Sequence, residues 1–275
     1  MIKRQFTKTV ALHYFKLVFR SILFLAALGA YIYNRVNNTG HFFSGFENNQ
    51  VLLGVIWLLF MVGMVFRFFP AKIESMGCQK QFKKNYKEVE GCERKPIVQP
   101  GIVTFSVAAA WIALNAIIGV LYYTHIIDKG ILLLIALAFS VCDIICILFF
   151  CPFQTWFMKN KCCATCRIYN WDYAMMFTPL IYIPNVYAWT LLGTALLLLI
   201  KWEVILHRYP ERFSEKCNKS LSCAMCQEKL CHQKRQLQSF LKKGQYNLSG
   251  NAFMKSPKKR LKTTGKERSP KCKKY

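Results

Sequence analysis

Long apolar runs are the feature that most constrains how this chain can fold. A helix rises about 1.5 Å per residue, so about 20 apolar residues are needed to cross the roughly 30 Å hydrocarbon core of a bilayer. Four runs are close to that length: Leu17–Tyr33, Val51–Phe69, Gly101–Tyr123 and Ile131–Cys151. A fifth apolar region, Ile168–Ile205, is longer and is interrupted by Pro179 and Pro184. The sequence therefore predicts an all-α, polytopic integral membrane protein built as a helical bundle.

Lysine and arginine are distributed unequally between the segments that separate the apolar runs. Residues 70–100 contain seven of them, whereas residues 34–50 contain only Arg35 and residues 124–130 contain only Lys129. Basic residues in short loops mark the cytoplasmic side of a membrane. We therefore expect the N-terminus and the 70–100 loop to be cytoplasmic. This asymmetry also accounts for most of the formal net charge of +25, which in a soluble protein would suggest a nucleic-acid partner.

The region Ile168–Ile205 decides the number of crossings. As a single span it gives five crossings and leaves the basic segment after it outside the cell. As a hairpin that turns at Pro184 and Asn185 it gives six crossings and keeps that segment in the cytoplasm. The first arm of such a hairpin, about Ile168–Ile183, reaches only ~24 Å, so a half-inserted arm is the main rival. Six crossings also leave every outer segment without cysteine, as expected for reduced thiols. We favour six crossings, with five as the alternative.

These expectations divide the chain into alternating basic and membrane segments. In order, they are a basic cytoplasmic N-terminus at 1–16, a first transmembrane helical pair at 17–69, a basic cytoplasmic loop at 70–100, a second transmembrane pair at 101–151, a Cys-rich cytoplasmic loop at 152–167, a Pro-broken hairpin or single span at 168–206, a Cys-rich cytoplasmic segment at 207–240 and a disordered basic tail at 241–275. Clusters of Lys and Arg in the tail predict contact with anionic lipid headgroups. Aromatic residues are sparse there, so nucleic acid is the less favoured partner. We expect the protein to lie in the plasma membrane.

Two Cys-x-x-Cys pairs are the strongest indication of chemistry. Cys163 with Cys166, and Cys223 with Cys226, supply the four thiolates of a tetrahedral zinc site. Possible additional ligands are Cys151, Cys162, Cys217 and Cys231. The separation of the two pairs is much wider than the roughly 15–20 residues of a compact zinc knuckle. Only a membrane hairpin that returns to the same face would bring them together.

Several functions remain open for this cysteine array. Four cysteine thiolates also hold iron–sulfur clusters, and paired thiols exchange disulfides. The first hypothesis is a membrane protein with a cytoplasmic thiolate metal site, structural or sensory, that holds zinc. The alternative is a membrane redox or electron-transfer protein with an iron–sulfur cluster or redox-active thiols. Thiols can also be inert and buried. No catalytic motif supports an enzyme.

A carboxylate inside an apolar run is the second unusual feature. Asp143 stands within the fourth run, where burial of a charge costs ~2.5–3.5 kcal/mol on insertion scales. Ser140, one turn away, and Asn115 in the third run would share its polar environment, and Arg67 would reach toward it. An interhelical bond that locks the bundle is the favoured interpretation. A proton or ion path through a small transporter is the third functional hypothesis.

A second polar group is expected where the two arms of the hairpin reach the cytoplasmic face. It comprises Arg167, Asp172, Lys201, Glu203 and His207. These residues would lie at similar depth, beside the cysteines of the 152–167 loop. We favour structural pairing among them over catalysis.

Overall fold

The computed structural model describes residues 8–37, 50–70, 77–92, 101–158, 162–222 and 225–226, with the side chains of residues 50–53, 155, 156 and 163 excepted. The long helices are α1 (Lys8–Val36), α3 (Gln50–Phe68), α5 (Gly101–Tyr123), α6 (Lys129–Leu148) and α8 (Val186–Arg208). The short elements are α4 (Cys78–Gln81), α7 (Asp172–Phe177), the 3₁₀ turns η1 (Lys83–Asn85), η3 (Cys163–Thr165), η4 (Arg167–Trp171), η5 (Thr178–Tyr182), η6 (Pro210–Phe213) and η7 (Lys219–Leu221), and the π-helical turn η2 (Phe153–Phe157). Within these ranges no strand is present beyond one isolated bridge. The predicted all-α class is confirmed.

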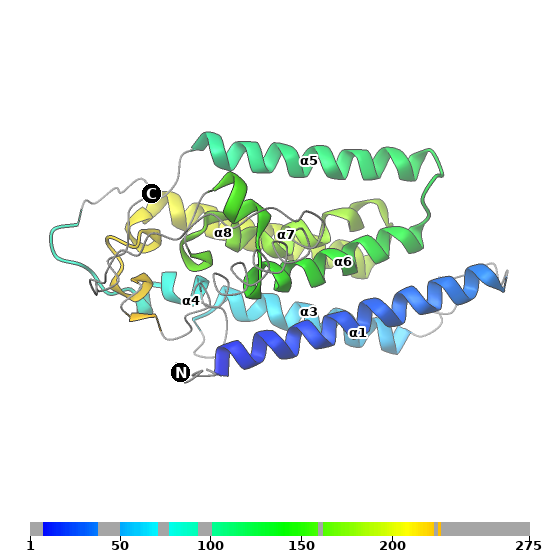
Figure 1. Cartoon of the computed structure of the whole chain (residues 1–275), viewed down its shortest axis with the longest axis horizontal. Coiled ribbons are helices and arrows are strands. Elements are labelled where there is room, and N and C mark those ends of the chain that lie inside the picture. Colours follow the sequence, from blue (N-terminus) through cyan, green and yellow to red (C-terminus); the bar gives the residue numbers. More distant parts are fainter. Residues whose placement is uncertain are drawn as a thin grey trace, which may run out of the picture. The chain divides into compact units, whose positions relative to one another are not determined.

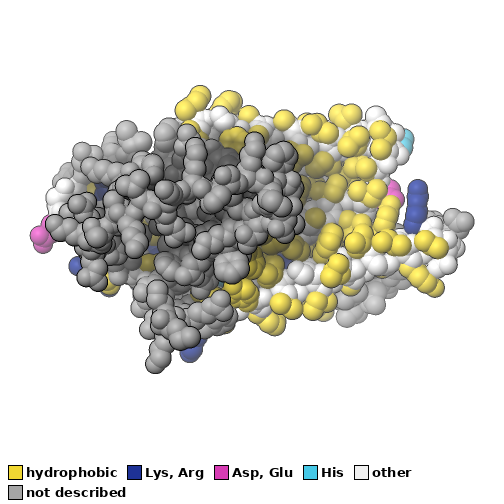
Figure 2. Space-filling view, in the orientation of Figure 1, with side chains coloured by type: hydrophobic (Ala, Val, Ile, Leu, Met, Phe, Trp, Pro, Cys, Tyr) yellow, Lys and Arg dark blue, Asp and Glu magenta, His cyan; other side chains and the backbone are white. Residues whose placement is uncertain are grey.

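Four helices, α1, α5, α6 and α8, are long and apolar enough to cross a membrane. A further apolar helix, α3, is described with its side chains over Gly54–Phe68. The outward faces are apolar as well: Ile112 of α5 is 68% exposed and Leu25 of α1 is 62% exposed. Figure 2 shows hydrophobic side chains across most of the described surface on this face. Such a surface is costly in water and is expected against lipid. By length and composition, the chain is a helical membrane protein.

The chain between α6 and α8 is helical but broken. Pro179 stands at the start of η5, where its missing N–H and fixed backbone prevent α7 from continuing as a regular helix. Pro184 lies in the gap between η5 and α8. Asn185 then caps α8, because its side-chain oxygen accepts a hydrogen bond from the Tyr187 N–H at 2.8 Å. Residues 183–185 therefore separate two helical segments.

The first of these segments, residues 167–182 and hereafter the arm, packs against α5, α6 and α8. At the start of the arm, Arg167 contacts Glu203 near the end of α8. At its end, the Tyr182 hydroxyl donates to the backbone oxygen of Asn115 in α5 at 2.9 Å. A Cβ at Gly119 would overlap the Tyr182 ring, so α5 needs a glycine at this contact. The arm and α8 are thus antiparallel neighbours inside the bundle.

The long helices pack in pairs, α1 along α6 and α3 along α8 (Figure 1). α3 and α8 run in the same direction. Trp57 near the start of α3 donates to Thr190 near the start of α8 at 2.9 Å, and Lys201 donates to the backbone oxygen of Phe68 at the end of α3. The largest apolar cluster lies where α3, the arm and α8 meet, and it includes Phe60, Met64, Phe177, Leu198 and Trp202.

One end of this bundle gathers most of the described polar segments. α1 and α5 begin there, and α3, α6 and α8 end there (Figure 1). Residues 77–92 and 209–222 lie at the same end. Because these segments belong to the Lys- and Arg-rich parts of the sequence, we name it the basic end.

Candidate functional site

Asp143 is held inside the bundle by an arginine of another helix. Arg20 of α1 places one guanidinium nitrogen 3.0 Å from Asp143 Oδ2 and 2.8 Å from the backbone oxygen of Ser140, both on α6. The two charged side chains are only 6% and 13% exposed. A buried charge in this environment is tolerated when it is paired and hydrogen-bonded. The pair therefore ties α1 to α6.

A second buried ion pair joins α3 to the arm. Arg67 donates to Asp172 Oδ1 at 2.6 Å, and the side chains are 7% and 8% exposed. The Arg67 guanidinium also lies over the Tyr173 ring, 4.7 Å from its centroid, and near the Tyr169 ring at 5.6 Å. These rings add cation–π attraction and shield the charge from lipid. Asp172 Oδ2 is buried and has no hydrogen-bond partner among the described residues.

The structure differs from the expected surroundings of Asp143 in two respects. Arg20 is its hydrogen-bonded partner, whereas Arg67 bonds to Asp172. Asn115 is buried, but its amide donates to the backbone oxygen of Trp111 on its own helix at 2.9 Å rather than to Asp143. Ser140 does share the site, through its backbone oxygen. Both differences arise because helix rotation, which the sequence does not specify, decides which polar groups meet.

A cavity of about 310 Å³ opens beside these two ion pairs. It lies between α5, α6, the η2 segment and the arm, and both Asp143 and Asp172 line it. Four cysteines line it too: Cys142, Cys146, Cys151 and Cys166. The remaining wall is mostly apolar and aromatic, with Trp111, Phe139, Tyr169, Met175 and Met176 among its residues. The cavity thus combines a hydrophobic interior with thiols and carboxylates.

Two of the cavity cysteines contact each other. The side chains of Cys146, in the last turn of α6, and Cys151, just beyond it, are joined by a hydrogen bond. The Gln154 N–H donates to the Cys151 sulfur at 3.4 Å. α6 ends at Leu148, and the turn that follows brings Cys151 back toward the helix. The result is a vicinal thiol pair inside the bundle.

A third ion pair fixes the start of the arm. Arg167 donates through Nε to both carboxylate oxygens of Glu203, each at 3.1 Å, and through its terminal nitrogen as well. Trp171 Nε1 donates to the same carboxylate at 2.7 Å. Because this bidentate pair is about one-fifth exposed, it lies nearer to solvent than the other two. The expected group of five thus divides: Arg167 pairs with Glu203, and Asp172 pairs with Arg67.

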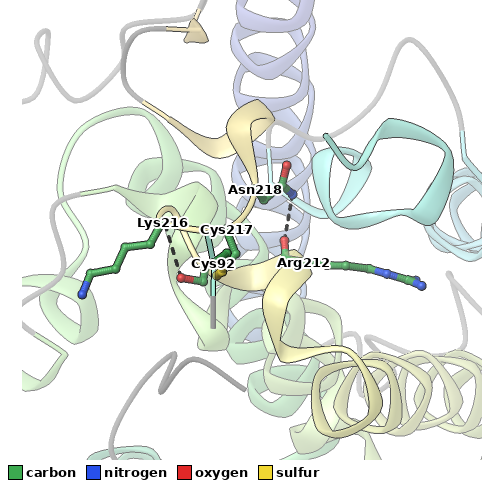
Figure 3. The surroundings of a disulfide bond; sticks show 6 residues. Cys92, Arg212, Lys216, Cys217 and Asn218 are labelled. Carbon is green, nitrogen blue, oxygen red and sulfur yellow. Dashed lines mark hydrogen bonds between the residues drawn. A yellow bond between two sulfur atoms is a disulfide. The ribbon is translucent and has the colours of Figure 1, made fainter. Parts of the chain in front are cut away.

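At the basic end, a disulfide links two segments that are far apart in the sequence. Cys92 and Cys217 are bonded across 125 residues (Figure 3). Beside the bond, the Val89 N–H donates to the Cys217 oxygen at 3.2 Å, and the Lys219 N–H donates to the Lys87 oxygen at 2.8 Å. Residues 77–92 and 209–222 are therefore paired by their backbones as well as by sulfur.

Asn218 completes this junction. It is fully buried, and its amide donates to the backbone oxygens of Lys80 at 3.0 Å and Arg212 at 2.8 Å. The side chains of Arg212 and Lys216 extend away from the sulfur atoms in Figure 3. The junction is therefore built from uncharged contacts, with the cations directed outward. We name residues 77–92 and 209–222, with their disulfide, the basic-end junction.

The predicted metal ligands divide between three places. Cys166 and Cys151 line the cavity, Cys217 is bonded to Cys92, and Cys162 and Cys226 are partly exposed. The side chain of Cys163, and Cys223 and Cys231 entirely, lie outside the described residues. In the part of the chain that is described, no three His, Cys, Asp or Glu side chains are arranged to hold a metal ion. The four-thiolate site therefore stays a prediction.

The basic tail, predicted to contact lipid headgroups, also lies outside the described residues.

Sequence reasoning missed two residues of these sites, Arg20 and Cys92, and the partner of a third, Asp172. Arg20 lies within the first apolar run, just as Asp143 lies within the fourth. Single opposite charges in two spans could have indicated the pair. Asp172 was assigned to the polar group at the hairpin face, but not to Arg67. Cys92 carries no local signal, since only packing brings it beside Cys217.

No protein-family profile, curated protein or solved structure matches this chain.

Proposed function

We propose that this chain is a six-crossing membrane protein in which Cys92 and Cys217 form a redox-responsive thiol pair on the cytoplasmic side. The observation that carries the proposal is their disulfide at the basic end. Cytosolic disulfides are usually transient, and they are catalytic or redox-sensing. A disulfide on the Lys- and Arg-rich side is therefore better explained by redox regulation than by permanent stabilisation.

The path of the chain supports six crossings. α1, α3, α5 and α6 account for four, and the arm and α8 form an antiparallel pair that accounts for two more. An even number of crossings returns residues 209–222 to the side of the membrane where α1 begins. This agrees with the excess of Lys and Arg both in the N-terminal segment and in the segment after α8. The arm is shorter than an ordinary span, and its packing against α5, α6 and α8 shelters its irregular backbone from lipid. The plasma membrane remains the predicted location.

The proposed exchange needs only a disulfide oxidant, such as oxidised glutathione or a protein disulfide. One thiol of the pair, as thiolate, attacks a sulfur of the oxidant and releases one thiol from it. The other thiolate then attacks the mixed disulfide, forms the Cys92–Cys217 bond and releases the second thiol. Two electrons and two protons pass from the pair to the oxidant. Oxidation adds a covalent link between the α3–α5 connection and the segment after α8, and reduction removes that link.

The test is a redox titration of the full chain in membranes. Vesicles are equilibrated in glutathione buffers, the remaining thiols are alkylated, and Cys92 and Cys217 are quantified by peptide mapping. We expect reversible formation of the bond, with a midpoint above about −300 mV, below which structural disulfides typically lie. After reduction, an impermeant thiol reagent should label Cys92, which is partly exposed, in inside-out vesicles and not in intact cells. A bond that resists reduction, or labelling from outside, would reject the proposal.

A thiolate metal site is a second candidate, because one contact favours it. Arg167 directly follows Cys166 and is bound to Glu203 near the end of α8. The first Cys-x-x-Cys pair therefore lies close to the start of the Cys-rich segment 207–240. Zinc bound by Cys163, Cys166, Cys223 and Cys226 would stabilise this face. Purified protein should then contain one zinc per chain, and Cys163→Ser with Cys166→Ser should remove it. Brown protein containing iron would support the cluster alternative. Metal-free wild-type protein would reject both.

A further inference from the structure

Two lysines lie next to each other in the basic-end junction. The isolated bridge there pairs Glu88 with Asn218 in antiparallel orientation, and the Lys219 N–H donates to the Lys87 oxygen at 2.8 Å. Lys87 and Lys219 are therefore opposite each other, one residue along from the bridge. Residues in such positions project from the same face, with Cβ atoms about 4.5–5.5 Å apart. The two ammonium groups can therefore reach the same small ligand.

This pair of like charges has no counter-charge from the described part of the protein. Both side chains are exposed, and neither forms an ion pair or a hydrogen bond with any described residue. Like charges directly opposite each other on paired segments destabilise the pairing. An anion held between Lys87 and Lys219 replaces this repulsion with two attractions. The junction is therefore stabilised by an anionic ligand at this position.

Two acids of the junction lie on the other side of the pairing. Side chains alternate between the two faces of an extended segment, so Tyr86 and Glu88 share a face that Lys87 does not. Burial raises the pKa of Tyr86, and the carboxylates of Glu88 and Glu211 raise it further. Both acids are thus close to the tyrosine. The face that carries the two lysines keeps its positive charge.

The junction lies at the depth of the lipid headgroups. Trp202 of α8 packs against Phe82 and Phe213, with ring centroids 5.1 Å and 6.1 Å apart. α8 ends at Arg208, only about 9 Å farther along its axis. Tryptophan and basic residues, here Trp202 and Lys201, are typical of the depth where a helix leaves the hydrocarbon core. Both segments of the junction therefore begin at the membrane surface.

The two ammonium groups favour one class of headgroup. A phosphate monoester carries about 1.5 to 2 negative charges at pH 7, whereas the phosphate diester of an ordinary phospholipid carries a single charge. Two neighbouring cations therefore match a monoester better than a diester. At a membrane surface, phosphate monoesters belong to phosphatidic acid and to phosphorylated inositol lipids, which basic clusters beside membranes bind.

We infer that Lys87 and Lys219 bind the phosphate monoester of a cytoplasmic-leaflet lipid, of the phosphorylated phosphatidylinositol class. The phosphate lies between the two ammonium groups on the surface of the basic-end junction. The choice of leaflet rests on the proposed six crossings, whereas binding itself needs only the backbone pairing and no thiol exchange. The site is separate from the lipid contact predicted for residues 241–275, because it belongs to residues 77–92 and 209–222.

Lysine footprinting tests the site in the full chain, because it measures each ammonium group separately from those of the tail. The oxidised protein is placed in phosphatidylcholine nanodiscs with or without phosphatidylinositol bisphosphate, acetylated briefly and analysed by peptide mapping. We expect the lipid to slow acetylation of Lys87 and Lys219 several-fold. Exposed lysines elsewhere, Lys8 at the start of α1 and Lys129 at the start of α6, should change much less. Unchanged rates at Lys87 and Lys219, or equal protection of all four, would overturn the inference.

Two further ligands identify the source of the phosphate. Phosphatidylserine at matched total charge offers no monoester, and it should protect the two lysines much less. Free inositol trisphosphate offers monoesters without a lipid, and it should protect them less at equal concentration because no membrane holds it at the site. Equal protection by phosphatidylserine would reject the monoester. Equal protection by the free headgroup would reject the lipid.

A charge variant tests whether the two lysines share one ligand. In Lys219→Gln, protection of Lys87 should require roughly fivefold more phosphatidylinositol bisphosphate, as expected for the loss of one basic residue near the surface. Lys8→Gln, the matched control at the same end of the bundle, should leave protection of Lys87 unchanged. Because Lys219 is exposed, its substitution removes no buried contact. Unaltered protection of Lys87 in Lys219→Gln would overturn the shared site.

The outcome is independent of the redox titration of Cys92 and Cys217. Protected lysines beside a disulfide that resists glutathione would reject the proposed redox pair and support the lipid site. A disulfide that titrates reversibly beside unprotected lysines would do the opposite.

Discussion

The interior of the bundle and the basic-end junction hold the chain together in different ways. Inside the bundle, the strong polar contacts are ion pairs between helices, Arg20 with Asp143 and Arg67 with Asp172. At the junction, the contacts are backbone hydrogen bonds, the buried amide of Asn218 and a disulfide. The Arg167–Glu203 pair, about one-fifth exposed, lies between these extremes.

The difference follows from the solvent around each region. In a lipid environment no water competes for a charge, so an unpaired carboxylate is very costly and a matched guanidinium becomes necessary. Near water, exposed ion pairs contribute little because solvent screens them. Segments at a membrane surface are therefore joined more effectively by buried neutral hydrogen bonds or by covalent links. The two regions also differ in reversibility, since only the disulfide responds to redox conditions.

Breaking a buried ion pair should have the largest effect. Arg20→Met leaves Asp143 without its partner, and we expect it to lower the free energy of unfolding by about 3 to 5 kcal/mol. Denaturant or thermal unfolding of the purified protein, followed by circular dichroism, measures this. The double variant Arg20→Met with Asp143→Leu removes both charges and should recover most of the loss. If the double variant is no more stable than Arg20→Met, charge pairing is not the reason for the contact.

Opening the disulfide should have the next largest effect, and that effect should be local. Cys217→Ser is expected to lower stability by about 2 to 4 kcal/mol. In hydrogen exchange, the amides of Val89 and Lys219 should lose protection, because they belong to the paired backbones beside the bond. Amides of α1 and α6 around Arg20 and Asp143 should keep theirs. Uniform loss across both regions would show that the junction and the bundle do not behave separately.

The contact between α5 and the arm gives a smaller test of packing inside the bundle. Gly119→Ala adds a Cβ that overlaps the Tyr182 ring, and we expect a loss of about 1 to 3 kcal/mol. Gly193→Ala is the matched control on α8, because nothing lies within 4 Å of its added Cβ. The control should be close to neutral in the same unfolding measurement. Equal effects of the two substitutions would mean that the arm does not approach α5 as described.

The cap at the start of α8 should contribute least. Asn185→Ala removes the side-chain acceptor for the Tyr187 N–H, at an expected cost of about 1 kcal/mol. Asn185→Ser keeps an acceptor and should be nearly neutral. The comparison is made by thermal unfolding against the wild type. A larger loss in Asn185→Ser than in Asn185→Ala would show that the cap does not set this turn.

Much of the helical architecture could be predicted because hydrophobic length is a local property. The run Gly101–Tyr123 has the same bounds as α5, and α8 begins at Val186, directly after the expected turn residues. α1 begins at Lys8, earlier than the apolar run from Leu17, because basic residues can extend a helix beyond the hydrocarbon region. Half of the four-thiolate site could not be compared, since Cys223 and the Cys163 side chain lie outside the described residues.

Amino-acid order by itself determined that this chain is helical, where its apolar helices lie and which loops are basic. Those properties depend on residues that are neighbours along the chain, whose hydropathy and charge act directly on each segment. Only the tertiary structure decided that Asp143 meets Arg20, that Asp172 meets Arg67 and that Cys92 meets Cys217. Each of these contacts joins residues more than one hundred positions apart, and it forms only when packing fixes the rotation and depth of two helices or loops.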